Sequence, residues 1–253
     1  MGTLSAPRKL KILIWDIETR YVVARLWRTG DQYVQHDQII TGQHVDIICI
    51  GYKWYGEKKV HCLTWDKNQN SAKMVEAFSK IVAQADLVVA HNGDKFDMKN
   101  LNTQRLLHGQ TPISWPTSED TLKQLRKLFA LPSYKLDYVA KLLTGDGKKP
   151  MAFDDWVQIV ENKSAKHLKK MVTYCKKDVK KLEEVYRKIE KFIPPKLNAS
   201  IAVHDNRLGC PRCGHQTLQK HGFRTTLTGR FQRLFCPACG SNSQQKLKLP
   251  KPA

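Results

Sequence analysis

Two matching cysteine knuckles near the C-terminus constrain the fold of this chain more than any other feature. They read CPRCG at 210–214 and CPACG at 236–240, which gives a C-x2-C-x22-C-x2-C pattern. Four thiolates at such a spacing form a closed tetrahedral zinc site that leaves no coordination position for water. In so small a unit, metal binding supplies the folding free energy. We therefore predict a structural zinc module with Cys210, Cys213, Cys236 and Cys239 as ligands.

The other three cysteines, Cys49, Cys62 and Cys175, stand alone within periodic segments. Their expected role is that of buried, inert thiols. The first residues lack the apolar core of a signal peptide, and no apolar run reaches the length of a membrane span. We therefore expect a cytoplasmic protein without membrane contacts, in a compartment where paired cysteines bind metal rather than form disulfides.

The chain is strongly basic, with 43 Lys and Arg against 23 Asp and Glu and a formal net charge of +20. A charge of this size attracts polyanions and accelerates their capture. Nucleic acid is the natural partner, although a highly charged surface also serves solubility alone. Charge by itself does not identify a reaction.

The hydrophobic period changes along the chain and indicates an α/β domain followed by a smaller unit. Strand patterns occupy 11–18, 19–27, 44–55, 58–65 and 86–90, and helical patterns occupy 74–82, 94–108, 120–130, 135–144 and 164–192. Pro194 and Pro195 prevent further helix. We expect a core domain over 1–192, a linker over 193–205, the zinc module over 206–242 and a mobile basic tail over 243–253.

Acidic residues occur at three places that suit a metal site. Asp16 and Glu18 lie two apart on a strand and project to one face, whereas Asp97 follows an apolar strand at the start of a helix. Tyr174 and Asp178 share one stripe of the last helix. Taken singly, each has a structural alternative, namely chance for the D-x-E triplet, helix-dipole stabilisation for Asp97, and an ion pair with a nearby lysine for Asp178.

Together, the ordered motifs D-I-E-T, N-x-x-x-F-D (Asn92 to Asp97) and Y-x-x-x-D resemble the DEDD exonucleases of the RNase H-like superfamily. Thr173 stands where the histidine subclass has its histidine, so the chain resembles the tyrosine subclass, DEDDy. The segment SYKLDYVAKLL is similar to the proofreading domains of B-family DNA polymerases. The resemblance spans roughly residues 10 to 190 and implies a mixed sheet flanked by helices.

The resemblance also implies roles for these residues. Asp16 would bridge two Mg²⁺ or Mn²⁺ ions, Glu18 and Asp178 would complete the site that activates water, and Asp97 would support the second ion. Tyr174 would orient the attacking water. Four residues would hold the terminal nucleotide, namely Ile17, Thr19, Asn92 and Phe96. Further acids that could support the ligands are Asp94, Asp120, Asp154 and Asp155.

Between the two knuckles, basic residues alternate with aromatic ones. This segment reads as a hairpin and resembles zinc ribbons of DNA-binding proteins such as some transposases. Arg224, Arg230 and Arg233 are suited to phosphate contacts, and phenylalanines can stack on bases. The alternative is that the phenylalanines only cover the zinc site.

The resemblance implies a free-standing 3′→5′ exonuclease that acts by two-metal hydrolysis, and together with the basic charge and the cysteine pattern it leads us to expect single-stranded DNA as substrate and one structural Zn²⁺. RNA and duplex 3′ ends are other candidate substrates, and such an enzyme would suit a virus or phage. Alternatives are a catalytically silent nucleic-acid-binding protein and a transposase-like endonuclease. The sequence leaves processivity and oligomeric state undetermined.

Overall fold

The computed structural model describes residues 10–41, 46–146, 151–204 and 208–248. The chain divides into two compact units, one of residues 11–186 and one of residues 187–253 together with 1–10.

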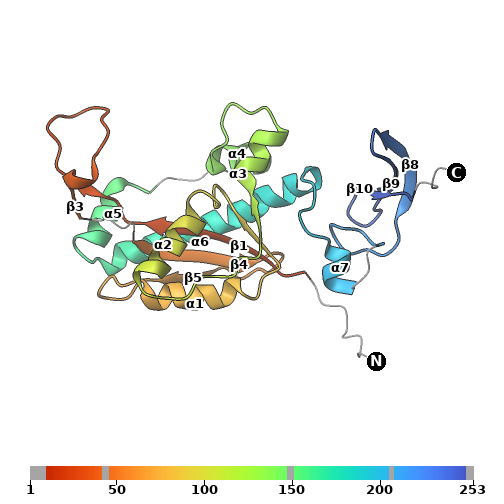
Figure 1. The fold of residues 1–253 in the computed structure, drawn as a ribbon. Helices are drawn as coiled ribbons and strands as arrows, with labels where there is room; N and C mark the ends of the chain where they lie inside the picture. The colour runs from red at the N-terminus through yellow and green to blue at the C-terminus, as the bar shows by residue number, and fades with distance from the viewer. Residues whose placement is uncertain (1–9, 42–45, 147–150, 205–207, 249–253) are drawn as a thin grey trace, which may run out of the picture. The chain divides into compact units, whose positions relative to one another are not determined.

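The first unit is built on a five-stranded mixed sheet with the order β5-β4-β1-β6-β7 (Figure 1). Its strands are β1 (Ile12–Thr19), β4 (Ile47–Trp54), β5 (His61–Thr64), β6 (Leu87–Ala90) and β7 (Thr117–Asp120). β1 and β4 are antiparallel, as are β4 and β5, whereas β6 is parallel to both β1 and β7. This mixed sheet with flanking helices is the predicted RNase H-like fold.

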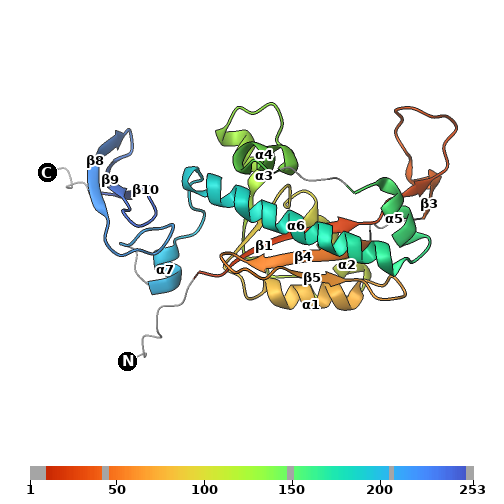
Figure 2. The same ribbon diagram turned by 180° about the vertical axis from the view of Figure 1, so that it is seen from behind.

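Helices cover both faces of the sheet because the strands are apolar on both sides. On one face, α1 (Ala72–Val82) and α2 (Asp97–Leu107) pack against Leu13, Trp15 and Ile17 of β1. On the other face, α5 (Phe153–Val160) and the long α6 (Ala165–Ile189) cover β4 (Figure 2). Alternation along β1 therefore directs Asp16 and Glu18 toward the α6 face.

Two shorter helices follow β7. Asp120 caps α3 (Thr121–Leu128) by accepting hydrogen bonds from the amides of Leu122 and Lys123. α4 (Leu136–Thr144) ends at Gly145, whose φ of 75° is the left-handed conformation that glycine adopts readily.

A short arm leaves the sheet between β1 and β4. It contains β2 (Val23–Ala24), the 3₁₀ turn η1 (His36–Gln38) and β3 (Ile39–Thr41). The predicted strand over 19–27 is therefore wrong except at Thr19, the last residue of β1, and at the two residues of β2. Its β-branched and aromatic residues gave the strand signal, but Val22 and Trp27 among them are exposed in the arm rather than paired in a sheet.

The second unit contains α7 (Ala199–His204) and a three-stranded sheet with the order β10-β9-β8. β8 (Gln219–Thr226) and β9 (Gly229–Phe235) form a hairpin, and β10 (Asn242–Lys246) pairs with β9. Thus α7 lies within the segment predicted as linker, and β10 lies at the start of the predicted mobile tail. Residues 249–253 of that tail are outside the described residues.

Candidate active site and zinc module

The C-terminal half of β1 carries the first acidic pair. Asp16 and Glu18 are partly exposed, and a carboxylate oxygen of each lies within 4.8 Å of the other and of the Cys175 Sγ atom on α6. Glu18 is opposite Cys49 in the β1–β4 register, and Asp16 is opposite Gly51. Two carboxylates this close supply the oxygen ligands that a hard divalent cation prefers.

Asp97 reaches the same strand from α2. Its Oδ1 atom accepts a hydrogen bond of 3.1 Å from the amide of Ile17, the residue between Asp16 and Glu18. The side chain is 2% exposed, and this burial raises the pKa of Asp97 to about 7, against the lowering effect of the two backbone hydrogen bonds that its carboxylate accepts. A bound cation would favour the ionised carboxylate and offset this desolvation.

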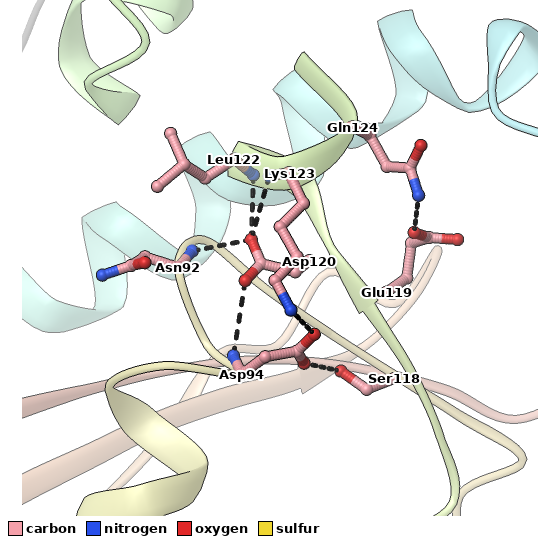
Figure 3. A network of polar contacts seen from close by, with 8 residues as sticks. All are labelled: Asn92, Asp94, Ser118, Glu119, Asp120, Leu122, Lys123 and Gln124. Carbon is pink, nitrogen blue, oxygen red and sulfur yellow. Dashed lines mark hydrogen bonds and ion pairs between the residues drawn. The ribbon is translucent and has the colours of Figure 1, made fainter. Parts of the chain in front are cut away.

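The turn before α2 is held by a network of polar contacts (Figure 3). Asp120 accepts hydrogen bonds from the amides of Asn92, at 3.0 Å, and Asp94. Asp94 in turn accepts from Ser118 and forms a 2.6 Å ion pair with Lys123. Asn92 has a φ of 66°, a left-handed conformation that asparagine tolerates better than most residues. Asp94 and Asp120 thus support the turn that precedes Asp97.

α6 supplies the third motif. The ring of Tyr174 lies edge-on to Trp156 of α5, with centroids 6.4 Å apart, and the Trp156 indole donates a 3.1 Å hydrogen bond to the carbonyl of Thr19. This contact links Tyr174 to the end of β1. Asp178 is 5% exposed, one helical turn beyond Cys175. Among the described residues, neither Asp97 nor Asp178 belongs to the 4.8 Å group formed by Asp16, Glu18 and Cys175.

The other predicted acids and nucleotide-binding positions are distributed around these motifs. Asp155 accepts from the amide of Ala152 and pairs with Lys170 at 2.6 Å, so it stabilises the start of α5 and its contact with α6. Asp154 is exposed on α5. Phe96 is 40% exposed, whereas Ile17 is buried in the core.

Sequence reasoning missed the exposed side chains of the arm. Trp27 is 97% exposed and Tyr33 is 88% exposed. The base of the arm is anchored beside the acidic strand, because Tyr21 donates a 2.6 Å hydrogen bond to Glu161 and its ring packs against Phe153. The sequence signal for an exposed aromatic side chain was Trp27 between Arg25 and Arg28 in RLWR at 25–28. This signal was overlooked because the segment was interpreted as a strand.

The four knuckle cysteines converge in the second unit. Their Sγ atoms all lie within 4.8 Å of one another, and the Cys210–Cys239 and Cys213–Cys236 separations are both 3.7 Å. Tetrahedral coordination with Zn–S bonds of about 2.3 Å places sulfurs about 3.8 Å apart. The cluster is therefore compatible with the predicted zinc site.

The two knuckles are built alike. In each, the amide of the glycine after the second cysteine donates a 2.9 Å hydrogen bond to the carbonyl of the first cysteine, and both glycines have positive φ. Beyond the knuckles, Arg230 lies 4.2 Å above the ring of Phe223, which is 51% exposed, and Arg224 contacts Gln244. Exposed side chains of β8 and β9 therefore present cations and an aromatic ring to solvent.

The fold and the clustered carboxylates together define an α/β protein of the nuclease type. A family model of the RNase_H superfamily matches residues 37–190, which is more than half of the chain, and the chain belongs to this superfamily. RNase H-like nucleases act on nucleic acids and use divalent metal ions. The match includes the motifs of Asp97 and Asp178 and begins after Asp16 and Glu18. A comparison with curated proteins found no match.

None of the described helices is both long and apolar enough to cross a bilayer.

Proposed function

We propose that this protein is a metal-dependent 3′→5′ exonuclease of the DEDDy type that degrades single-stranded DNA. The observation that carries the proposal is the pair of carboxylates on β1, Asp16 and Glu18, with the buried carboxylate of Asp97 hydrogen-bonded to the amide of Ile17 between them. Acidic side chains from distant parts of the chain that lie close together raise the free energy of the folded protein unless a cation is bound between them.

Each motif has a role in this proposal. Asp16, Glu18, Asp97 and Asp178 hold two Mg²⁺ or Mn²⁺ ions, and the Tyr174 hydroxyl orients the attacking water. Paired divalent ions in such sites activate water and stabilise charge on the leaving oxygen. The Trp156 indole, by contacting both Tyr174 and the Thr19 carbonyl, fixes the position of the tyrosine relative to β1.

The arm and the second unit support a single-stranded substrate. Unstacked bases bind exposed aromatic side chains, and such stacking contributes about 1–3 kcal/mol per base. Trp27 and Tyr33 offer two such exposed rings in the arm that follows β1, with Arg25 and Arg28 close in sequence. In the second unit, which we propose holds one Zn²⁺ on its four cysteines, Arg224, Arg230 and Arg233 contact the phosphates.

The proposal is tested with single-stranded DNA labelled at either end, incubated with Mg²⁺, Mn²⁺ or EDTA. We expect progressive shortening from the 3′ end with either ion and none with EDTA. Asp16→Asn should abolish cleavage and retain DNA binding, whereas Asp137→Asn, at an exposed position on α4, should cleave like the wild type.

Other products identify the alternatives. Binding of DNA without any cleavage supports a silent binding protein, and cleavage of a closed circular strand supports an endonuclease. Faster degradation of RNA would redirect the substrate assignment, because contacts to the 2′ position distinguish RNA from DNA. Full activity of Asp16→Asn would refute the proposed site.

A further inference from the structure

Three cysteines outside the zinc module meet beneath α6. The Sγ atoms of Cys49 on β4, Cys62 on β5 and Cys175 on α6 all lie within 4.8 Å of one another. Cys49 and Cys175 are fully buried, and Cys62 is partly exposed at the edge strand of the sheet. Cys49 and Cys62 lie on the neighbouring strands β4 and β5, whereas Cys175 comes 113 residues after Cys62, so the fold brings the third thiol to the other two.

The register of the sheet explains this meeting. Gly51 lies opposite Cys62 on β5 and is two residues from Cys49, so all three face the same side. A Cβ atom at position 51 would lie 2.7 Å from the Cys175 Sγ atom, closer than such contacts occur. Glycine at this position therefore admits the Cys175 thiol between the other two.

The cluster has the dimensions of a metal-thiolate site. Three sulfurs bound to one Zn²⁺ at about 2.3 Å lie about 3.8–4.0 Å apart, which is within the observed limit. Cys175 also lies within 4.8 Å of a carboxylate oxygen of Asp16 and of Glu18, whereas among the described residues neither acid belongs to the group of the three thiols. One of these carboxylates would have to move toward the thiols to supply an oxygen ligand. Thiolates with one oxygen ligand suit a thiophilic ion such as Zn²⁺ or Cd²⁺ and not Mg²⁺.

We propose that Cys49, Cys62 and Cys175 form a second thiophilic metal site, completed by a carboxylate oxygen of Asp16 or Glu18, and that its occupation inhibits the nuclease. The ion draws one carboxylate away from the Mg²⁺ ligands. Partial exposure of Cys62 provides the route of entry. The inhibition rests on the proposed function, whereas the binding of the ion does not.

Binding is tested on the full-length reduced protein by titration with Cd²⁺, which produces a thiolate absorption in the ultraviolet. We expect the wild type to bind one Cd²⁺ at the knuckle cysteines and a second at this cluster. The single substitution Cys62→Ser, at the partly exposed position, should remove the second ion and leave the first. Independently of any variant, Cd²⁺ should protect Cys62 of the wild type from alkylation, as mapped by mass spectrometry.

Inhibition is tested with Cd²⁺ or Zn²⁺ in excess Mg²⁺. Loss of a residue that only hydrogen-bonds to a metal ligand weakens metal binding by about 10–100-fold. Loss of a direct ligand in Cys62→Ser should therefore raise the Cd²⁺ concentration needed for half inhibition by at least ~10-fold. Only one Cd²⁺ per wild-type chain, with Cys62 alkylated equally in its presence, would show that the thiols merely fill the core and would overturn the proposal. If the wild-type protein binds two Cd²⁺ ions but has no nuclease activity, the proposed function is refuted and the second metal site is still supported.

Discussion

Asp97 is the residue at which burial and the proposed function conflict most directly. Its pKa is raised from an ordinary value of 3.8 to about 7 because burial disfavours the ionised carboxylate. Without metal, the folded protein binds this proton more tightly than the unfolded chain does. The resulting stabilisation is complete below about pH 4 and is lost as the pH rises toward 7.

We therefore expect Asp97→Asn, which is neutral at every pH, to be increasingly more stable than the wild type between pH 4 and 7 in EDTA. The shift corresponds to a few kcal/mol at most, since one pKa unit is about 1.4 kcal/mol. Thermal unfolding of both proteins across this range measures it. Adding Mg²⁺ should reduce the stability difference between the two proteins by stabilising the wild type. If the stabilities of both proteins change in parallel with pH in EDTA, the raised pKa of Asp97 is contradicted.

At the scale of residues, the acids that lie near one another were easier to predict than the contacts that hold them in place. Asp16, Glu18 and Asp97 were recognisable because they occur in ordered motifs, and the structure brings Asp97 to the strand of the other two. The role of Asp120 was not predictable. It depends on the meeting of a β7 residue with the turn at Asn92, and that contact is not encoded in local spacing. The approach of Cys175 to the acids has the same origin, because it follows from how α6 crosses the sheet.

At the scale of elements, long periodic segments were predicted well and short ones poorly. α6 and β1 were identified because their apolar residues recur with one period over many residues. α5 was missed because it has only eight residues and is stabilised by tertiary contacts such as the Asp155–Lys170 pair. Propensity also failed in the arm, where aromatic residues that favour strands are exposed.

The arm provides a prediction of its own. Replacing Trp27 and Tyr33 together by Ala should raise KM for a single-stranded oligonucleotide by about 30-fold or more, because two base stacks worth about 1–3 kcal/mol each are lost. Hydrolysis of the p-nitrophenyl ester of thymidine 5′-monophosphate, which lacks the neighbouring bases that would stack on the arm, should be unchanged. Steady-state kinetics on both substrates measure this difference.

The matched control is the double substitution Trp27→Phe and Tyr33→Phe, which keeps two aromatic faces and removes only the indole and the hydroxyl. We expect it to retain most of the affinity for the oligonucleotide. Equal KM values for the alanine variant and the wild type would show that the arm contacts something other than the substrate. A loss of activity on the ester would indicate that the arm instead supports the structure of the acidic site.

For the whole molecule, the question is what a small basic unit contributes to a core that carries its own acidic site. From His204 onward the chain has nine Lys and Arg and one acidic residue. Each phosphate that such a unit contacts releases a counterion, so affinity falls more steeply with salt as contacts are added. If the second unit holds substrate, loss of this unit should both weaken DNA binding and reduce the salt dependence of the affinity.

The full-length variant Cys236→Ser/Cys239→Ser tests this expectation. We expect it to lose its zinc, and amide exchange should then show residues 208–248 unprotected while residues 11–186 keep their protection, because few mini-domains fold without their metal. This variant should bind a long single strand more weakly than the wild type, and its plot of log K against log salt should have a smaller slope. Its rate on the small ester should not change. Arg224→Ala/Arg233→Ala, which leaves the cysteines in place, should reproduce the weaker slope and keep the zinc. Should both variants bind DNA with the wild-type salt dependence, the second unit would recognise a different partner, and the nuclease core alone would hold the substrate.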